Sequence, residues 1–165
     1  MGLTVPMKII DVHTHAFPDR LAEQAMAGLL KAAGNYRPHT DGTIAGLTAS
    51  MDAAGITSSF VLNIATNPRQ AGNIRRWCSE IGSDRIIPVG SVHPRSPSAA
   101  AELAALKDAG VKGVKLHPVY QNFNADDKAV FPVYETISSL GMRLQNRLRQ
   151  TVGEKPGLIS GAVLI

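Results

Sequence analysis

Four short apolar segments alternate with helical segments along this chain, and that alternation limits the folds available to it. Predicted strands cover residues 7–12, 59–64, 85–92 and 111–116, and predicted helices cover 19–33, 43–54, 69–81, 99–109 and a last segment from Asp126 or Asp127 to Leu140. Strands joined through helices favour parallel pairing with right-handed crossovers. The strands are apolar without clean alternation, as is typical of a sheet covered on both faces. The pattern predicts an α/β fold built from parallel β/α units.

The composition is that of a globular protein. Of the 165 residues, 44% are hydrophobic and 18% are charged, which excludes a disordered or collagen-like chain. No segment approaches the roughly 18 to 20 apolar residues that cross a membrane. The N-terminus lacks a basic region and reaches Asp11 and His13 too soon for a signal peptide. The single cysteine, Cys78, excludes an intramolecular disulfide. We therefore expect a cytoplasmic protein with no membrane partner.

The net charge of +4 is concentrated at the C-terminal end of the chain. Residues 1–140 contain 13 basic and 12 acidic side chains, whereas residues 141–165 contain four basic side chains and one acidic side chain. A nucleic-acid-binding surface needs a basic face on the folded body, commonly with aromatic residues among the basic ones. The sequence of the body has no such pattern, so the charge does not predict a nucleic-acid partner.

The side chains that can support chemistry follow the ends of the predicted strands. Asp11, His13 and His15 follow the first strand, and alternate residues of an extended chain point to one side. In parallel α/β folds, active sites form at the carboxyl ends of the strands. Two imidazoles on one side can share a divalent ion, and a neighbouring carboxylate can bind that ion or orient an imidazole. The alternative is a pair of polar loop histidines that bind no metal.

Lys115 and His117 repeat this alternation at the end of the fourth strand, so they also share a side. The lysine could hold a carboxylate or phosphate group of a substrate, or could be carboxylated and bridge two metal ions. His117 could serve as a ligand, a proton shuttle or a substrate contact. The structural alternative is a lysine that extends to solvent and a loop histidine before Pro118. His93, which precedes Pro94 after the third strand, is a weaker candidate of the same kind.

These motifs resemble the amidohydrolase superfamily, specifically its amidohydrolase-2 (amidohydrolase-related) branch. Ile10–His15 (IDVHTH) is similar to the family's opening metal motif, and Met51–Ile56 (MDAAGI) is similar to its second unit. Gly113–Pro118 (GVKLHP) is similar to its fourth unit. The downstream residues that match this unit are Gln121, Phe123, Asn124, Asp126 and Asp127. The resemblance covers roughly residues 7–141.

The resemblance implies the N-terminal half of a TIM-type (β/α)8 barrel with one or two divalent metal ions at the carboxyl ends of its strands. It implies metal ligation by His13 and His15, and it carries Lys115 and His117 over as substrate-binding residues. The expected ion is zinc, with manganese or iron as alternatives. Such an enzyme uses metal-activated water to hydrolyse an amide, ester or lactone in a small molecule, or it supports non-oxidative decarboxylation. A non-catalytic metal-binding or interaction fragment is the alternative of another class.

The family pattern stops near Met142. The family places a further histidine on its fifth strand and a catalytic aspartate on its eighth, whereas residues 142–157 are polar and basic, with no strand pattern and no histidine. A full barrel needs roughly 200 to 250 residues. We therefore predict a partial barrel over residues 1–141 and an atypical basic tail over 142–165. The catalytic residues are undetermined, and we expect the family's activity to be weak or absent in this chain alone.

Two hypotheses explain this break. The chain is either a truncated or frame-shifted gene product, or a half-barrel that forms a homo-oligomer because parallel strands leave exposed edges. The apolar segment 158–165 could cover one such edge. If a frameshift is responsible, sequencing the gene should reveal another reading frame after codon 142 that encodes a continuing barrel. A gene without such a frame would contradict the frameshift hypothesis.

Overall fold

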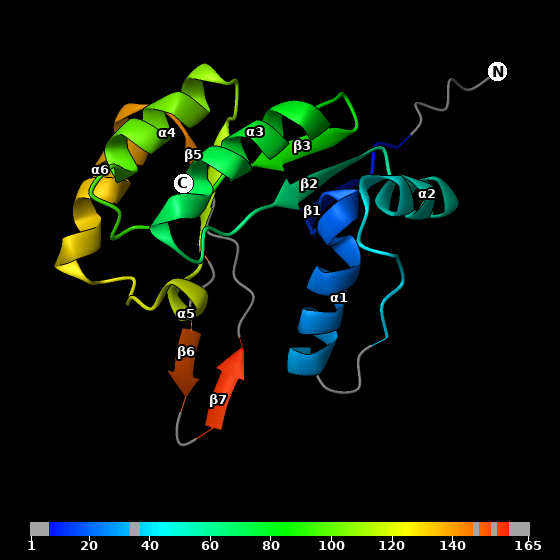
Figure 1. The fold of residues 1–165 in the computed structure, drawn as a ribbon, viewed down its shortest axis with the longest axis horizontal. Coiled ribbons are helices and arrows are strands. Elements are labelled where there is room, and N and C mark those ends of the chain that lie inside the picture. Colours follow the sequence, from blue (N-terminus) through cyan, green and yellow to red (C-terminus); the bar gives the residue numbers. More distant parts are fainter. Residues whose placement is uncertain (1–6, 34–36, 147–148, 153–154, 159–165) are drawn as a thin grey trace. The chain divides into compact units, whose positions relative to one another are not determined.

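The computed structural model describes residues 7–33, 37–146, 149–152 and 155–158. The chain divides into two compact units. The first runs to Leu62 and includes Ile81–Ile87, and the second contains Asn63–Glu80 and the chain from Pro88 onward. Figure 1 shows the helices and strands that make up each unit.

The elements of the first unit alternate as the sequence predicts. They are β1 (Ile10–Thr14), α1 (Asp19–Ala33), α2 (Ile44–Ala54) and β2 (Ser58–Leu62). Strands β1 and β2 pair in parallel, with an irregularity in register between Asp11 and Thr14. Helix α2 begins where the Thr43 side chain accepts a hydrogen bond from the Gly46 amide, and it ends at Gly55 in the left-handed conformation. These are the start and stop that the sequence predicts for this helix.

The remaining elements also follow a strand–helix order. They are η1 (Pro68–Gln70), α3 (Ala71–Ile81), β3 (Ile86–Val89), α4 (Ala99–Asp108), β4 (Gly113–Leu116), α5 (Pro118–Gln121), η2 (Lys128–Val130), α6 (Phe131–Ser139), β5 (Arg143–Asn146), β6 (Arg149–Val152) and β7 (Lys155–Leu158). The sheet order is β1-β2-β3, and β4 pairs in parallel with β5. A parallel bridge between Gly90 and Val114 joins the end of β3 to β4. The predicted parallel β/α arrangement is therefore confirmed.

The core of the second unit lies between its strands and helices α4 and α6. Leu103 and Leu106 of α4, Val114 and Leu116 of β4, and Ile137 of α6 are all buried in one apolar cluster. Gly90 lies against this cluster, where an added Cβ atom would come within 2.8 Å of the Leu106 side chain. A larger residue here would therefore require the buried Leu106 side chain to move, and glycine avoids that shift.

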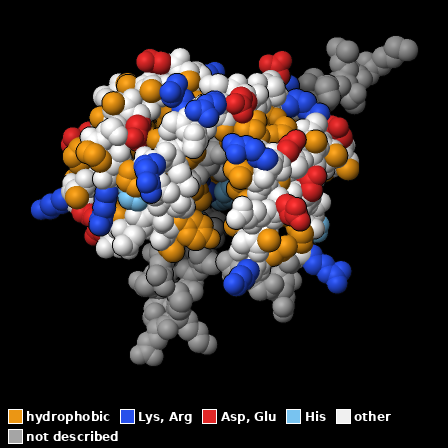
Figure 2. Space-filling view, viewed as in Figure 1, with side chains coloured by type: hydrophobic (Ala, Val, Ile, Leu, Met, Phe, Trp, Pro, Cys, Tyr) orange, Lys and Arg blue, Asp and Glu red, His pale blue; other side chains and the backbone are white. Residues whose placement is uncertain are grey.

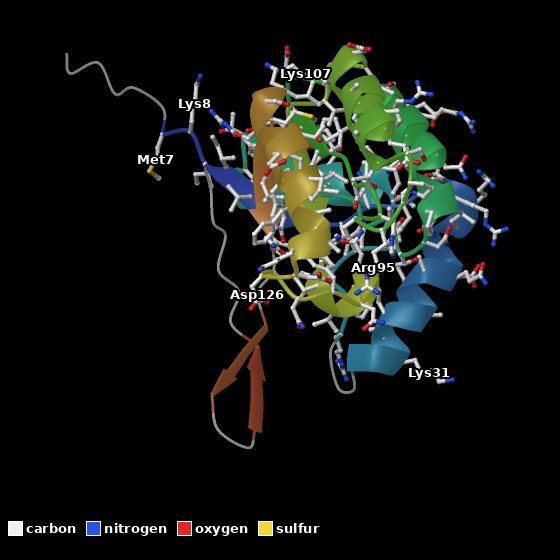
Figure 3. All side chains as sticks on the ribbon, turned by 90° about the vertical axis from the view of Figure 1, so that its left-hand side faces the viewer. Met7, Lys8, Lys31, Arg95, Lys107 and Asp126 are labelled. Carbon is white, nitrogen blue, oxygen red and sulfur yellow. The ribbon has the colours of Figure 1, made fainter. Side chains whose placement is uncertain are left out.

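Among the described residues up to Asn146, the charged side chains other than Lys115 are at least partly exposed. Figure 2 shows Lys and Arg interspersed with Asp and Glu on the face in view. Lys31, near the end of α1, and Lys107, in the last turn of α4, point away from their helices (Figure 3). Both sites favour a cation, because the helix dipole places partial negative charge at a C-terminus. Among the described residues, no helix has both the length and the apolar character needed to span a bilayer.

Strands β5, β6 and β7 and the short helix α5 differ from the sequence prediction. Residues 142–157 were expected to lack a strand, but β5 pairs with β4 over four residues in register, from Gly113 opposite Arg143 to Leu116 opposite Asn146. The strand was missed because its stability comes from backbone pairing and from Leu144, which packs on the core, rather than from an apolar run. The segment 117–125 was expected to be a loop, but it contains α5, which at four residues is too short to show helical periodicity.

The end of the chain is only partly described. Strands β6 and β7 form an antiparallel pair, seen in Figure 1. The apolar segment that we expected to cover a sheet edge falls, except for Leu158, outside the described residues.

Cys78 supplies a test of the core. Its side chain is buried in α3, and burial raises the pKa of the thiol to about 12, so almost no thiolate is present at pH 8. We expect the native chain to react with a thiol reagent only as fast as the core opens, and the urea-unfolded chain to react at once. A Ser79→Cys variant places a second thiol on an exposed neighbouring position and should add one fast equivalent. Equal native and unfolded rates for the wild-type chain would contradict this burial.

Candidate functional site

The first candidate pair, His13 and His15, lies at the carboxyl end of β1. The strand reaches Thr14, so His13 belongs to it and His15 follows it directly. The Thr14 hydroxyl donates a hydrogen bond of 2.8 Å to the Phe60 carbonyl, which fixes this end of β1 to β2. The two imidazole rings lie 5.3 Å apart between centroids, at 71° to each other. The predicted strand covered 7–12, so the structure shifts this strand toward the histidines.

The geometry of this pair fits a shared metal ion. The Nδ1 atom of His15 lies 2.9 Å from the Leu62 carbonyl oxygen, which as an acceptor favours the tautomer protonated at Nδ1. That tautomer leaves the lone pair on Nε2, the form in which metal-ligating histidines commonly occur. Two imidazoles bound to one tetrahedral zinc ion at about 2.0–2.1 Å place their centroids roughly 5 Å apart. The observed spacing between His13 and His15 is close to this value.

The neighbouring carboxylate contributes to local structure. The Oδ1 atom of Asp11 accepts a hydrogen bond of 3.0 Å from the His13 amide, which supports the irregular stretch of β1. Within the described part of the chain, no group of three or more His, Cys, Asp or Glu side chains is arranged to hold a metal ion. Two imidazoles alone would be an incomplete ligand set, since structural zinc sites have four ligands and catalytic sites usually have three from the protein.

The second candidate pair, Lys115 and His117, lies at the carboxyl end of β4. Both residues are buried, with exposed fractions of 1% for Lys115 and 3% for His117. The alternative of a lysine that extends to solvent is therefore wrong. Lys115 is held by its backbone, because its amide donates to the Gly90 carbonyl and its carbonyl accepts from the Ser91 hydroxyl. Burying a charged ammonium group costs free energy unless a polar or oppositely charged group lies beside it, so the buried position favours such a group next to the Lys115 side chain.

His117 ends the strand and begins α5. Its Nδ1 atom accepts a hydrogen bond of 3.4 Å from the Tyr120 amide, and its ring stacks on the Tyr120 ring with centroids 4.2 Å apart. An accepting Nδ1 favours the neutral tautomer with its proton on Nε2. His117 is thus oriented by the short helix that it precedes. Pro118 occupies the first position of this helix, where a backbone N–H would have no partner within the helix and proline has none to satisfy.

A buried polar network surrounds the second pair. Gln121 is 1% exposed, and its amide nitrogen donates 2.8 Å hydrogen bonds to the carbonyls of Ala65 and Val92. Its Oε1 atom accepts a 2.8 Å hydrogen bond from the His117 amide. Sequence reasoning gave Gln121 no role beyond its place in the family motif. The one available signal was a glutamine four residues after a strand-end histidine.

His93, the weaker candidate, has a local role. Its Nδ1 atom accepts a hydrogen bond of 3.3 Å from the Arg95 amide. Burial and the positive charge of Arg95 lower the pKa of His93 below its ordinary value, with Glu102 acting in the opposite direction. The lowered pKa favours the neutral ring, whose Nδ1 atom stabilises the turn after β3.

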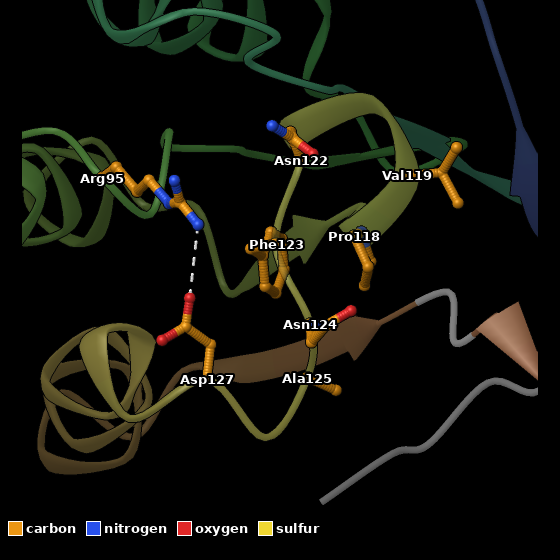
Figure 4. Close-up of a pocket in the computed structure, with 8 residues that line it drawn as sticks. All are labelled: Arg95, Pro118, Val119, Asn122, Phe123, Asn124, Ala125 and Asp127. Atoms are coloured by element: carbon orange, nitrogen blue, oxygen red, sulfur yellow. Dashed lines mark hydrogen bonds and ion pairs between the residues drawn. The ribbon is translucent and has the colours of Figure 1, made fainter.

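A pocket of about 330 Å³ lies in the second unit, outside the set of predicted site residues. Its lining residues are Arg95, Pro118, Val119, Asn122, Phe123, Asn124, Ala125 and Asp127. Figure 4 shows Arg95 extending toward Asp127, with the Phe123 ring close to both. Because Arg95 forms an ion pair of 3.3 Å with Asp127, its guanidinium is already neutralised. The pocket therefore offers little net charge to an anionic ligand.

The two candidate pairs belong to different units. His13 and His15 are part of the first unit, and Lys115 and His117 are part of the second. Each pair is consequently a separate observation, and each lies at the carboxyl end of a parallel strand, as predicted.

The chain belongs to the amidohydrolase family. The family model described as Amidohydrolase, that of the amidohydrolase-2 branch, matches residues 10–145, which is most of the chain. The match extends from the first strand through nearly all of β5. A comparison with curated protein sequences found no match.

Solved structures confirm the fold. 5-Carboxyvanillate decarboxylase from Sphingomonas paucimobilis is 18% identical, with a TM-score of 0.70, and the match covers 87% of this chain and 52% of that one. The corresponding enzyme from Novosphingobium aromaticivorans, complexed with manganese and 4-hydroxy-3-methoxy-5-nitrobenzoic acid, is 15% identical, with a TM-score of 0.60 and coverage of 85% and 50%. A probable 2-pyrone-4,6-dicarboxylic acid hydrolase from Acinetobacter baumannii is 19% identical, with a TM-score of 0.51 and coverage of 85% and 49%.

The chain spans about half the length of these solved relatives. The fold is thus that of a partial TIM-type amidohydrolase barrel, as the sequence predicts. Because the sequence identities are low, these similarities establish the fold alone. The manganese ion was observed in the Novosphingobium enzyme.

Proposed function

We propose that this chain carries the first metal-binding part of an amidohydrolase-family enzyme, with His13 and His15 as ligands of a divalent ion. The observation that carries the proposal is the 5.3 Å spacing of the two rings together with the bond from His15 Nδ1 to the Leu62 carbonyl. This bond orients the imidazole in the way that outer partners orient metal-binding histidines in other proteins. Zinc is our first choice of ion, and the manganese complex of a solved relative supports manganese as the alternative.

The reaction that we propose first is hydrolysis of an amide, ester or lactone bond in a small molecule. A divalent ion bound here would lower the pKa of a water molecule and polarise a carbonyl group. Lys115 is proposed to contact a negatively charged group of the substrate, and His117 to donate a hydrogen bond through Nε2–H. The position of both residues at the carboxyl end of β4 supports these roles, because active sites of parallel α/β folds form there.

Non-oxidative decarboxylation is the second candidate. It is favoured by the solved structures with the same fold, which include decarboxylases of 5-carboxyvanillate and of 2,6-dihydroxybenzoate. An aromatic carboxylic acid would then be the substrate class, and Lys115 would pair with its carboxylate. A non-catalytic metal-binding fragment is the remaining alternative, and the activity measurement below separates it from both enzymes.

The active form is proposed to need further ligands beyond the two imidazoles. A second copy of the chain, which would cover the exposed apolar side chains of β1, is the proposed source. Ile10 and Val12 of this strand are each 52% exposed. We propose the cytoplasm as the compartment, a choice that the single cysteine supports.

The metal proposal predicts a localised response to manganese. In an isotope-labelled chain, added Mn²⁺ should broaden the NMR signals of His13 and His15 before those of the other histidines. A His13→Asn variant should bind Zn²⁺ at least tenfold more weakly in a calorimetric titration, because it removes a ligand. His39→Asn, at an exposed position in another segment, is the matched control and should leave the affinity unchanged. Equal effects of the two substitutions would overturn the assignment.

The activity proposal predicts weak turnover by the 165-residue chain itself. Two imidazoles leave a tetrahedral ion short of protein ligands, so rates with Zn²⁺ or Mn²⁺ should barely exceed those of the ion alone. Ester and lactone substrates should be assayed for released acid, and aromatic acids for released carbon dioxide. Rapid turnover that is lost in His13→Asn would refute the expected impairment, and the product released would identify the reaction.

A further inference from the structure

The Gln121 side chain makes three hydrogen bonds at the strand ends of the second unit, and the family comparison gives it no role. We infer that Gln121 is the positioning residue of His117 and that it binds together the segments that follow β2, β3 and β4. The inference rests on the proposed function in one respect, namely that His117 contacts the substrate.

The geometry uses both N–H groups and the carbonyl oxygen of the side-chain amide of Gln121. Its two N–H groups reach two different carbonyls, those of Ala65 and Val92, each at 2.8 Å. Its oxygen accepts from the His117 amide at 2.8 Å. A glutamine side chain has two donors and one carbonyl oxygen, so an aliphatic or acidic side chain of similar length could not make the same three bonds.

Ser91 extends the same network. Its hydroxyl donates a hydrogen bond of 2.8 Å to the Lys115 carbonyl and accepts a hydrogen bond of 3.0 Å from the Ala65 amide. Ala65 is therefore held through both of its backbone polar groups, by Ser91 at the amide and by Gln121 at the carbonyl. All of these groups are buried, where hydrogen bonds exclude competing water and unsatisfied partners are costly.

The network determines where the His117 ring lies. Gln121 fixes the His117 amide at the point where β4 becomes α5, and the ring then bonds to the Tyr120 amide and stacks on the Tyr120 ring. Without the Gln121 bond, the turn that starts α5 would lose the contact that anchors it to the loops after β2 and β3. We therefore expect the ring to lose its single orientation, while the apolar core stays formed.

The test separates positioning from general stability. Gln121→Met keeps the length and volume of the side chain and removes all three hydrogen bonds. In histidine-labelled protein, the wild-type His117 ring should give the ¹⁵N shifts of the tautomer protonated at Nε2. The variant should give averaged or doubled shifts for His117. Leu103→Ala is the matched control, because it creates a cavity in the apolar core, removes none of these hydrogen bonds, lowers Tm and should leave the His117 shifts unchanged.

Several results would overturn the inference. Wild-type His117 shifts in Gln121→Met despite a lower Tm would reduce Gln121 to a structural residue. If Gln121→Met does not fold, hydrogen exchange in the wild-type chain decides. The side-chain amide protons of Gln121 should exchange at least a hundredfold more slowly than those of Gln24, which is on an exposed position of α1. Equal exchange rates would show that the three bonds do not persist. None of these readouts involves metal, so they can fail or succeed independently of the His13 and His15 assignment.

Discussion

The contact of Gly90 with β4 is the interaction on which the second unit depends. The Gly90 amide donates to the Gly113 carbonyl, and its carbonyl accepts from the Lys115 amide, so the end of β3 is aligned with β4 residue by residue. Because Gly90 has no side chain, Leu106 can pack directly over this contact. The alignment brings Ser91 beside the Lys115 carbonyl and thereby makes the polar network around Gln121 geometrically possible.

Much of the fold could be predicted because its signals are local. Helix α1 has the predicted bounds, since Asp19 begins it and an apolar periodicity runs through to Ala33. Helix α2, predicted over 43–54, runs over Ile44–Ala54 and buries Leu47 and Met51, which lie one turn apart. Strand β5 could not be predicted, because its residues are mostly polar. The strand is stabilised by pairing with β4, and the residue types of β5 alone do not reveal that partner.

The candidate site divides in the same way. Alternation along an extended chain was enough to place His13 near His15 and to put both at a strand end. It could not reveal the bond from His15 to the Leu62 carbonyl, because that partner is a backbone atom of another strand. The contacts of Gln121 were hidden for the same reason, since two of its three partners are carbonyls and the third is an amide. A hydrogen bond to a backbone atom cannot be predicted from the type of the residue that carries that atom, because every residue has a backbone carbonyl.

The bonding of Ala65 has a further consequence for how this protein can change. A segment held by its main chain depends less on the side chains it carries, and the exposed neighbour Thr66 bonds locally, through a hydrogen bond from its hydroxyl to Gln70 Oε1. Ala65, Ser91 and Gln121 form a buried group whose hydrogen bonds to the main chain fix the path of the segments after β2, β3 and β4. Exposed side chains along these segments can therefore change without altering how the strands are joined.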